Sequence, residues 1–235
     1  MIKLRAFGLF GLFLLFLPGL FSCDDEKIIA TAEDDAFITV KVEKNDTLYG
    51  LVLHGFGTRD FASVSATDEE GLPYTLSSYN HYTYEYIYKT NNDLLSKTIP
   101  TIGEYNFSNI FLTGTTYSST NYLSKDCIYP TAITTCEYDS TEEKINLEWD
   151  INGDADFIVI YLTDEDGNTT FVSNSINGSS TSYSISSDTD YWGNFIPING
   201  TRYTVTIYMY LYETTGEDLN IQCRAENNST VIWGK

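Results

Sequence analysis

The chain has 235 residues and a formal net charge of −20 at pH 7, with 33 aspartates and glutamates against 13 lysines and arginines. A surface this acidic excludes nucleic acid as a natural partner, because phosphates bind to cationic surfaces, and it suits a self-repelling module outside the cell. The sequence is rich in tyrosine, threonine, serine and asparagine, which favour strands and turns. It contains no convincing long amphipathic helix, so an all-β fold is expected.

The N-terminus has the organisation of a secretory signal peptide. Lys3 and Arg5 form a short positive head, and residues 6–17 are nearly all phenylalanine, leucine and glycine. This apolar run is too short to span a bilayer core, which needs about 20 residues. Ser22 supplies the small residue before a cleavage site. We therefore expect residues 1–22 to be removed from the mature protein.

Residues Leu20–Cys23 resemble the lipobox of bacterial lipoproteins, in which the signal peptide is cut just before the cysteine. The resemblance implies that the Cys23 thiol carries a diacylglycerol and its freed amine a third acyl chain, which together anchor a protein firmly. The three acids at residues 24–26 resemble the export signal of Bacteroidota surface lipoproteins, which implies the outer face of the outer membrane. Residues 23–35 are expected to form an acidic tether. The alternative for Cys23 is an ordinary signal peptide with an incidental cysteine. The acids would form a solvated, disordered tether whether or not they also act as an export signal.

An internal repeat organises the rest of the chain. Shifting the sequence by 96 residues aligns Leu51–Gly71 with Leu147–Gly167 without a gap. The identical pairs are Leu51/Leu147, Gly57/Gly153, Asp60/Asp156, Phe61/Phe157, Thr67/Thr163, Asp68/Asp164, Glu69/Glu165 and Gly71/Gly167. The repeat predicts two domains, over residues 36–129 and 130–235, joined near Pro130.

The first copy contains a strand with a tyrosine at every second position, over residues 81–89. Because side chains alternate along a strand, Tyr82, Tyr84, Tyr86 and Tyr88 share one face. The opposite face is mostly polar. We therefore expect the tyrosine face to pack inward at least in part, with an exposed ligand platform as the alternative.

In the second copy, short apolar or alternating stretches are separated by turn residues. The expected strands cover residues 144–150, 156–162, 169–174, 181–186, 202–213, 219–225 and 229–233. Asp166-Gly167 supplies a tight hairpin between two of them. Short strands at this regular spacing predict a β-sandwich.

Two motifs of the second copy resemble a fibronectin type III domain over residues 131–235: Leu-x-Trp at 147–149 and Gly-x-x-Tyr-x-Val at 200–205. The resemblance implies that Trp149 belongs to the core and that Tyr203 makes a corner hydrogen bond. The whole chain is thus expected to be all-β, with two tandem sandwiches of the immunoglobulin-like or fibronectin type III-like kind after a lipoprotein signal peptide.

The first copy carries this resemblance by the repeat only. Leu53 stands where the second copy has its tryptophan, and Gly103, Tyr105 and Phe107 replace the tyrosine strand. The first domain is therefore expected to be a more divergent immunoglobulin-like sandwich. A fold shared by so many proteins does not indicate a function by itself.

Three cysteines remain after lipidation: Cys127 in the joint, Cys136 on the first strand of the second domain and Cys223 on its last. An exported chain permits disulfides. Cys223 can pair with either of the other two, because the first and last strands of a sandwich can be neighbours. Buried reduced thiols are the alternative.

The sequence shows no catalytic motif and no cofactor motif. The only histidines, His54 and His81, lie in different strand contexts. We expect no enzyme activity and no cofactor; a hidden carboxylate pair remains the trailing alternative. Clustered oxygens at residues 152–156 and 163–168 lack the spacing of an EF-hand and serve as turns, so no metal site is predicted.

A candidate ligand surface lies on the strand at residues 202–213. Its inner face is filled by apolar residues, which leaves Tyr208, Tyr210 and Tyr212 pointing outward. With Trp192 from a nearby loop they are expected to form a platform on which sugar rings stack, spaced by about 6.5–7 Å. The surrounding acids favour a neutral glycan. The alternative is that Trp192 folds under its loop and that the first domain covers the tyrosines.

These features together predict an outer-membrane lipoprotein that is anchored by its lipid, exposed at the cell surface and not catalytic. The first functional hypothesis is glycan capture as an accessory of polysaccharide uptake. The second is protein binding as a structural or adhesin-type surface subunit.

Overall fold

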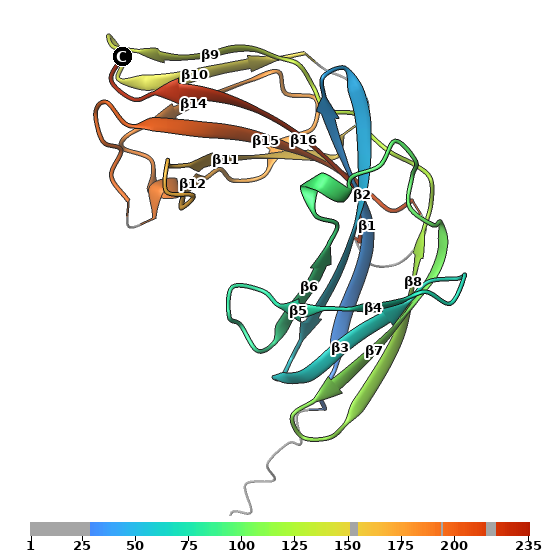
Figure 1. The fold of residues 1–235 in the computed structure, drawn as a ribbon. Helices are drawn as coiled ribbons and strands as arrows, with labels where there is room; N and C mark the ends of the chain where they lie inside the picture. Colours follow the sequence, from blue (N-terminus) through green and yellow to red (C-terminus); the bar gives the residue numbers. More distant parts are fainter. Residues whose placement is uncertain (1–28, 151–154, 194, 215–219) are drawn as a thin grey trace, which may run out of the picture.

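The computed structural model describes residues 29–150, 155–193, 195–214 and 220–235, and nearly all of its regular structure is strand (Figure 1). Two short 3₁₀ helices complete it, η1 (Asn92–Leu94) and η2 (Asp190–Trp192). Across those residues no helix is long and apolar enough to cross a membrane. The expected signal peptide and the lipidation site Cys23 lie outside the described residues.

The first sandwich consists of two packed sheets. Its strands are β1 (Ala32–Glu43), β2 (Asp46–Gly57), β3 (Phe61–Thr67), β4 (Pro73–Thr75), β5 (Ser77–Ser78), β6 (Glu85–Lys89), β7 (Gly103–Phe111) and β8 (Thr116–Leu123). One layer has the order β1-β2-β6-β5, and the other has the order β4-β3-β7-β8. Alternate residues from both layers fill the space between them.

The second sandwich repeats this plan. Its strands are β9 (Ile133–Asp139), β10 (Lys144–Trp149), β11 (Phe157–Thr163), β12 (Thr169–Val172), β13 (Ile176–Asn177), β14 (Ser182–Ser186), β15 (Arg202–Tyr212) and β16 (Ile221–Ile232). One layer has the order β14-β10-β9, and the other has the order β12-β11-β15-β16, with β13 paired to β11. The expected fold class, two fibronectin type III-like or immunoglobulin-like sandwiches, is confirmed.

The internal repeat corresponds to equivalent structure. Strands β3 and β11 are offset by the same 96 residues, and both enter a hairpin closed by an aspartate. The Asp68 amide donates to the carbonyl of Leu72 at 3.2 Å, and the Asp164 amide donates to that of Asn168 at 3.0 Å. Gly71 and Gly167 have φ angles of +87° and +86°, which side chains rarely adopt. The hairpin predicted at Asp166-Gly167 is therefore confirmed.

The core residues implied by the family resemblance are also confirmed. Trp149 is 2 % exposed, and the Tyr203 hydroxyl accepts a hydrogen bond from the Ile198 amide at 3.2 Å. The first sandwich has its own tyrosine corner, because the Tyr105 hydroxyl donates to the Thr101 carbonyl at 2.7 Å. Leu53 is fully buried in place of a tryptophan.

The two sandwiches share one sheet. Strand β1 pairs in parallel with β16, from Ile38 opposite Cys223 to Lys41 opposite Glu226. This pairing joins the two layers into a nine-stranded sheet, which has the order β12-β11-β15-β16-β1-β2-β6-β5 and includes β13 as a second partner of β11. It also satisfies backbone groups that two separate sandwiches would leave unpaired at their sheet edges. Strand β1 starts earlier than expected, since Ala32 already pairs with Gly57, so the predicted tether over residues 23–35 is wrong in its last four positions.

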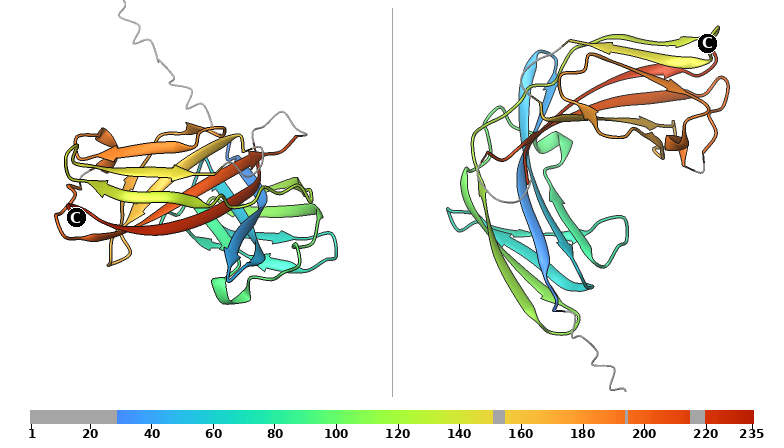
Figure 2. Two further views of the ribbon diagram at one scale, coloured as in Figure 1. Left: turned by 90° about the horizontal axis from the view of Figure 1, so that it is seen from above. Right: turned by 180° about the vertical axis from the view of Figure 1, so that it is seen from behind.

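One face of the shared sheet is covered by the second layers of the two sandwiches. The opposite face has no such layer, and we call it the free face. Ile38 and Cys223 are paired and both fully buried, so the second layers of both sandwiches lie on the same side of the sheet. Figures 1 and 2 show the consequence: the molecule is bent like a letter C, and the nine-stranded sheet lines the inside of the bend. Side chains on its free face therefore point toward the hollow side of the molecule.

Candidate binding surface

The three predicted tyrosines lie on the free face of the nine-stranded sheet. On β15 the neighbouring positions Ile207 and Met209 are buried, and the alternate positions Tyr208, Tyr210 and Tyr212 point to the opposite side and are half-buried. The side chains of these three tyrosines thus point outward, as expected from the sequence.

These tyrosines pack against rings of the neighbouring strand β11. Phe157 is paired with Tyr210, and their rings stack with centroids 4.5 Å apart and planes 1° apart. Tyr212 tilts against Phe157 at 5.1 Å, and Tyr161 meets Tyr208 edge to face at 5.2 Å. We call these five side chains, Phe157, Tyr161, Tyr208, Tyr210 and Tyr212, the tyrosine face.

Arg224 connects the tyrosine face to the first sandwich. Its guanidinium carbon lies 4.9 Å from the centroid of the Tyr208 ring and 5.5 Å from that of Phe37 on β1. Such cation–π contacts stabilise a partly desolvated cation. The guanidinium also lies near the Tyr210 hydroxyl and lowers its pKa, while its Nε has no partner among the residues that the structure describes.

The hydroxyls of Tyr161, Tyr208 and Tyr210 are neutral at physiological pH, because burial raises the pKa of each. Burial raises the pKa of Tyr210 to about 12, and Arg224 only partly opposes this. Burial also raises the pKa of Tyr208, with a further contribution from Glu226 and a small one from Tyr79 of the first sandwich. Neutral phenols can both donate and accept hydrogen bonds.

Trp192 does not belong to this surface, and the predicted platform that included it is wrong in this respect. Trp192 is 3 % exposed, and its Nε1 donates to the Ser186 carbonyl at 2.7 Å. Its ring meets Phe171 and Trp233 at 5.3 Å each, inside the second sandwich. Burial with a satisfied N–H is more favourable for an indole than exposure in a loop. The structure follows the alternative in which Trp192 plugs its loop.

The other tyrosine-rich segment divides in two. Tyr86 and Tyr88 of β6 pack toward the first core, against Phe61 at 5.6 Å and Tyr74 at 5.1 Å. Tyr82 is 48 % exposed, because the strand only begins at residue 85. Two consecutive positive φ angles at residues 80 and 81 turn the chain just before it. The inward packing holds for the last two tyrosines.

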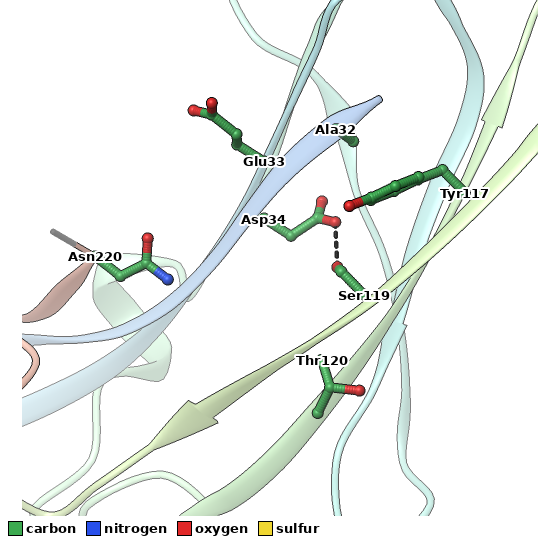
Figure 3. Close-up of a pocket in the computed structure, with 7 residues that line it drawn as sticks. All are labelled: Ala32, Glu33, Asp34, Tyr117, Ser119, Thr120 and Asn220. Carbon is green, nitrogen blue, oxygen red and sulfur yellow. Dashed lines mark hydrogen bonds between the residues drawn. The ribbon is translucent and has the colours of Figure 1, made fainter. Parts of the chain in front are cut away.

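An acidic pocket of about 430 Å³ lies beside the start of β1 (Figure 3). It is lined by Ala32, Glu33, Asp34, Tyr117, Ser119, Thr120 and Asn220. Asp34 Oδ2 accepts hydrogen bonds from the Ser119 hydroxyl and, at 2.7 Å, from Asn109 Nδ2. Asp34 Oδ1 and Asn109 Oδ1 are buried without a partner in the described part of the chain. Burial raises the pKa of Asp34.

The two histidines of the chain lie in different surroundings. His54 Nε2 lies 3.0 Å from Glu85 Oε1, whereas His81 occupies an exposed turn. No group of three or more histidine, cysteine, aspartate or glutamate side chains there is placed to hold a metal ion. The Asp164 carboxylate closes its own hairpin by accepting from the Asp166 and Asn168 amides. Residues 152–154 of the other oxygen-rich turn lie outside the described residues.

Sequence reasoning missed the partners of the tyrosine face. Phe157 and Tyr161 stand in a segment that is apolar throughout, where periodicity does not distinguish the two faces. Arg224 is one of few cations in the second domain, which was a signal, but its position between two sandwiches depends on the β1–β16 pairing.

Comparison of the sequence with protein-family models and with curated proteins gives no match. Among solved structures, similar chains include a two-domain fibronectin type III segment of chicken tenascin, with 13 % identity and a TM-score of 0.30 over 85 % of this chain and 99 % of that one. The 47-kilodalton lipoprotein Tp47 of Treponema pallidum has 10 % identity and a TM-score of 0.38 over 86 % of this chain. A tandem-repeat segment of a large adhesion protein has 17 % identity and a TM-score of 0.29 over 84 %.

This chain spans 49 % of the length of each of the last two structures. Similarities of this size concern the fold, and no function is taken from them.

Proposed function

We propose that this protein is a non-catalytic binding module of the cell surface, and that the tyrosine face binds a protein partner. The observation that carries the proposal is the cluster of five aromatic side chains on the free face of the shared sheet, with Arg224 beside it. Tyrosine and arginine are enriched among the residues that dominate protein–protein binding energies. Rings that are already held by their neighbours lose little side-chain entropy when a partner binds.

The stacking geometry favours a protein over a sugar chain. The faces of Phe157 and Tyr210 meet each other in a parallel stack, so those faces are not open to a sugar ring. What the cluster offers outward is a mixture of apolar edges and neutral hydroxyls. Such amphipathic surfaces are typical of protein interfaces.

A neutral glycan is the second candidate, and a specific observation favours it too. The phenol hydroxyls of Tyr208 and Tyr210 stay neutral, and Arg224 supplies N–H donors beside them. Sugar hydroxyls can bond to both kinds of group. In this case the protein would serve as a capture accessory of polysaccharide uptake.

We also propose that Cys23 anchors the protein by lipid in the outer membrane, exposed at the cell surface. The lipobox-like residues Leu20–Cys23 support this. Ala32 lies at the start of β1, whereas the residues of β1 that pair with β16 are Ile38–Lys41, further along the strand. Anchoring at Cys23 would therefore hold the first sandwich near the membrane and present the second sandwich outward.

Photocrosslinking on intact cells tests the binding surface. A benzophenone amino acid is placed at Tyr212 and, as a matched control, at Tyr122, which is 57 % exposed on β8 outside the shared sheet. We expect a discrete protein adduct from position 212 and none from position 122. Equal adducts from both positions, or none from either, would contradict a protein partner at this face.

The glycan candidate is tested by affinity electrophoresis in neutral polysaccharides. Retention that the double variant Tyr208→Ala/Tyr210→Ala loses, at an unchanged melting temperature, would establish the glycan in place of the protein. Loss of retention together with a melting temperature lower by several degrees would show that these rings only stabilise the fold.

A further inference from the structure

The linker between the sandwiches lies against β16. Gln222 Nε2 donates to the carbonyls of Ser124 and Asp126 at 2.9 and 3.1 Å, and the Ser124 amide donates back to Gln222 Oε1 at 3.2 Å. Asn227 Nδ2 donates to the Thr131 carbonyl at 2.6 Å. The linker is thus held along β16, the strand that also pairs with β1.

Two cysteines lie where this linker is hydrogen-bonded to β16. The thiol of Cys127, in the linker, and the thiol of Cys223 on β16 lie close enough for each to shift the pKa of the other. The Cys223 sulfur also lies 3.9 Å from the carbonyl oxygen of Ile128, the residue after Cys127. Cys127 is half-buried, and Cys223 is fully buried.

The third cysteine is placed elsewhere. The Cys136 side chain lies beside Ser229, which is six residues further along β16 than Cys223. Six residues of strand span about 20 Å, whereas the Cα atoms of a disulfide lie within about 7 Å. Of the two pairings that the sequence left open for Cys223, only the one with Cys127 agrees with the structure.

We propose that Cys127 and Cys223 form a disulfide that fixes the interdomain linker to β16. The oxidant is a small-molecule or protein disulfide. The Cys127 thiolate attacks one of its sulfurs, forming a mixed disulfide and releasing one thiolate. The Cys223 sulfur, after losing its proton, then attacks the Cys127 sulfur and releases the second thiolate. Two protein thiols are oxidised, one external disulfide is reduced to two thiols, and the two protons go to the leaving thiolates.

The local environment assigns these roles to the two thiols. Cys127 is reachable from solvent, and the neighbouring Cys223 lowers the pKa of its thiol, although burial opposes this. The neighbouring Cys127 and burial raise the pKa of Cys223. The half-buried, more acidic thiol of Cys127 is therefore the one that meets the oxidant, and the fully buried thiol of Cys223 resolves the mixed disulfide.

The disulfide would stabilise the folded molecule as a whole, and we call this effect the clamp. Cys127 and Cys223 are 96 residues apart, and Cys223 stands opposite Ile38 in the β1–β16 pair. Closing a loop of this length restricts the unfolded chain strongly, and we expect the melting temperature to rise by about 10 °C.

Thiol counting on the full chain with Cys23→Ser tests the proposal. The reduced protein is incubated with oxidised glutathione, denatured, alkylated and digested. We expect one alkylated cysteine, Cys136, and a peptide pair that joins Cys127 to Cys223 with a mass lower by two hydrogens. Three alkylated cysteines, a stable glutathione adduct at Cys127, or a bond to Cys136 would each overturn the proposal.

Matched variants separate the clamp from general effects of oxidation. Cys136→Ser should keep the disulfide and the rise in melting temperature, whereas Cys127→Ser should lose both. A disulfide that forms in the Cys136→Ser protein without raising its melting temperature would contradict the clamp.

Discussion

Neighbouring carboxyl groups on β1 point to opposite faces of the shared sheet and differ in their surroundings. Asp34 faces the first core and bonds with Asn109 and Ser119. Asp35 accepts a hydrogen bond from the Ile221 amide at 3.0 Å, and its Oδ1 is buried without a partner in the described residues. Burial raises the pKa of Asp35 from 3.8 to about 7, and the nearby Glu213 adds to this.

Asp35 should make the protein less stable as the pH rises. A raised pKa in the folded state means that the folded protein binds the proton more tightly than the unfolded chain. The contribution is fully present below pH 3.8 and is lost as the pH rises through about 7. Asp35→Asn should therefore raise the melting temperature at pH 8 by at least about 2 °C and have little effect at pH 4. Melting curves across this range check it; the same shift at every pH would contradict the linkage, and Glu104→Gln, exposed on β7, is the control.

Trp192 gives a second expectation at the residue scale. Its ring is enclosed by Phe171, Tyr203 and Trp233. Trp192→Ala should lower the free energy of unfolding by about 3–5 kcal/mol, because it leaves a cavity in the core. Urea denaturation measures this. Tyr191→Ala, whose side chain is 43 % exposed next to it, should cost much less. Equal costs for the two variants would place Trp192 at the surface after all.

At the scale of the element, the two repeated hairpins use one design with different burial. Asp68 is 3 % exposed; its Oδ1 accepts from the Glu70 and Leu72 amides at 3.1 and 2.8 Å, and its Oδ2 accepts from the Tyr74 hydroxyl at 3.1 Å. Asp164 makes the corresponding backbone bonds in a more open position. A lost hydrogen bond is costlier where water cannot replace the missing partner.

Removing these aspartates should therefore have unequal effects. Asp68→Ala should lower the free energy of unfolding by about 1–3 kcal/mol, because it removes the three hydrogen bonds that a buried carboxylate accepts. Asp164→Ala should lower it less. Chemical denaturation of the two variants in parallel measures the difference. If Asp164→Ala lowered the free energy of unfolding more than Asp68→Ala, burial of the aspartate would not determine how much its hydrogen bonds stabilise the protein.

At the scale of the whole molecule, the β1–β16 pairing joins the two sandwiches through one continuous sheet. Backbone pairing between them continues over Ile38–Lys41, and the Gln222 side chain fixes the linker beside it. Tandem domains joined only by a linker can unfold independently. Here each sandwich supplies an edge strand that the other one needs.

We expect a single cooperative unfolding transition. Ile207→Ala, in the core of the second sandwich, should lower the melting temperature of the whole protein without separating two transitions. Calorimetry measures this through the agreement between the calorimetric and van't Hoff enthalpies. Val64→Ala in the first core should shift the same single peak. Two resolved peaks in either variant would show that the sandwiches unfold separately.

Several features of this protein followed from the sequence alone because they depend on neighbours along the chain. Alternation of apolar and polar residues determines which face of β15 is buried. The turn residues Asp166 and Gly167 determine their hairpin, and Tyr203 bonds to Ile198, only five residues away. The 96-residue repeat carries the same layout into the first sandwich. These local rules were enough for the all-β fold and for the outward direction of the three tyrosines.

Only the tertiary structure decided which distant segments meet. Ile38 and Cys223 are paired although they lie far apart in the sequence, and no local pattern in either strand predicts that the two strands pair. The same long-range pairing places Arg224 between Phe37 and Tyr208 and brings Cys127 to Cys223. Trp192 is buried because the second core has room for its ring and the Ser186 carbonyl for its N–H. Contacts of this kind depend on shape and hydrogen-bond partners assembled in three dimensions, which residue spacing does not encode.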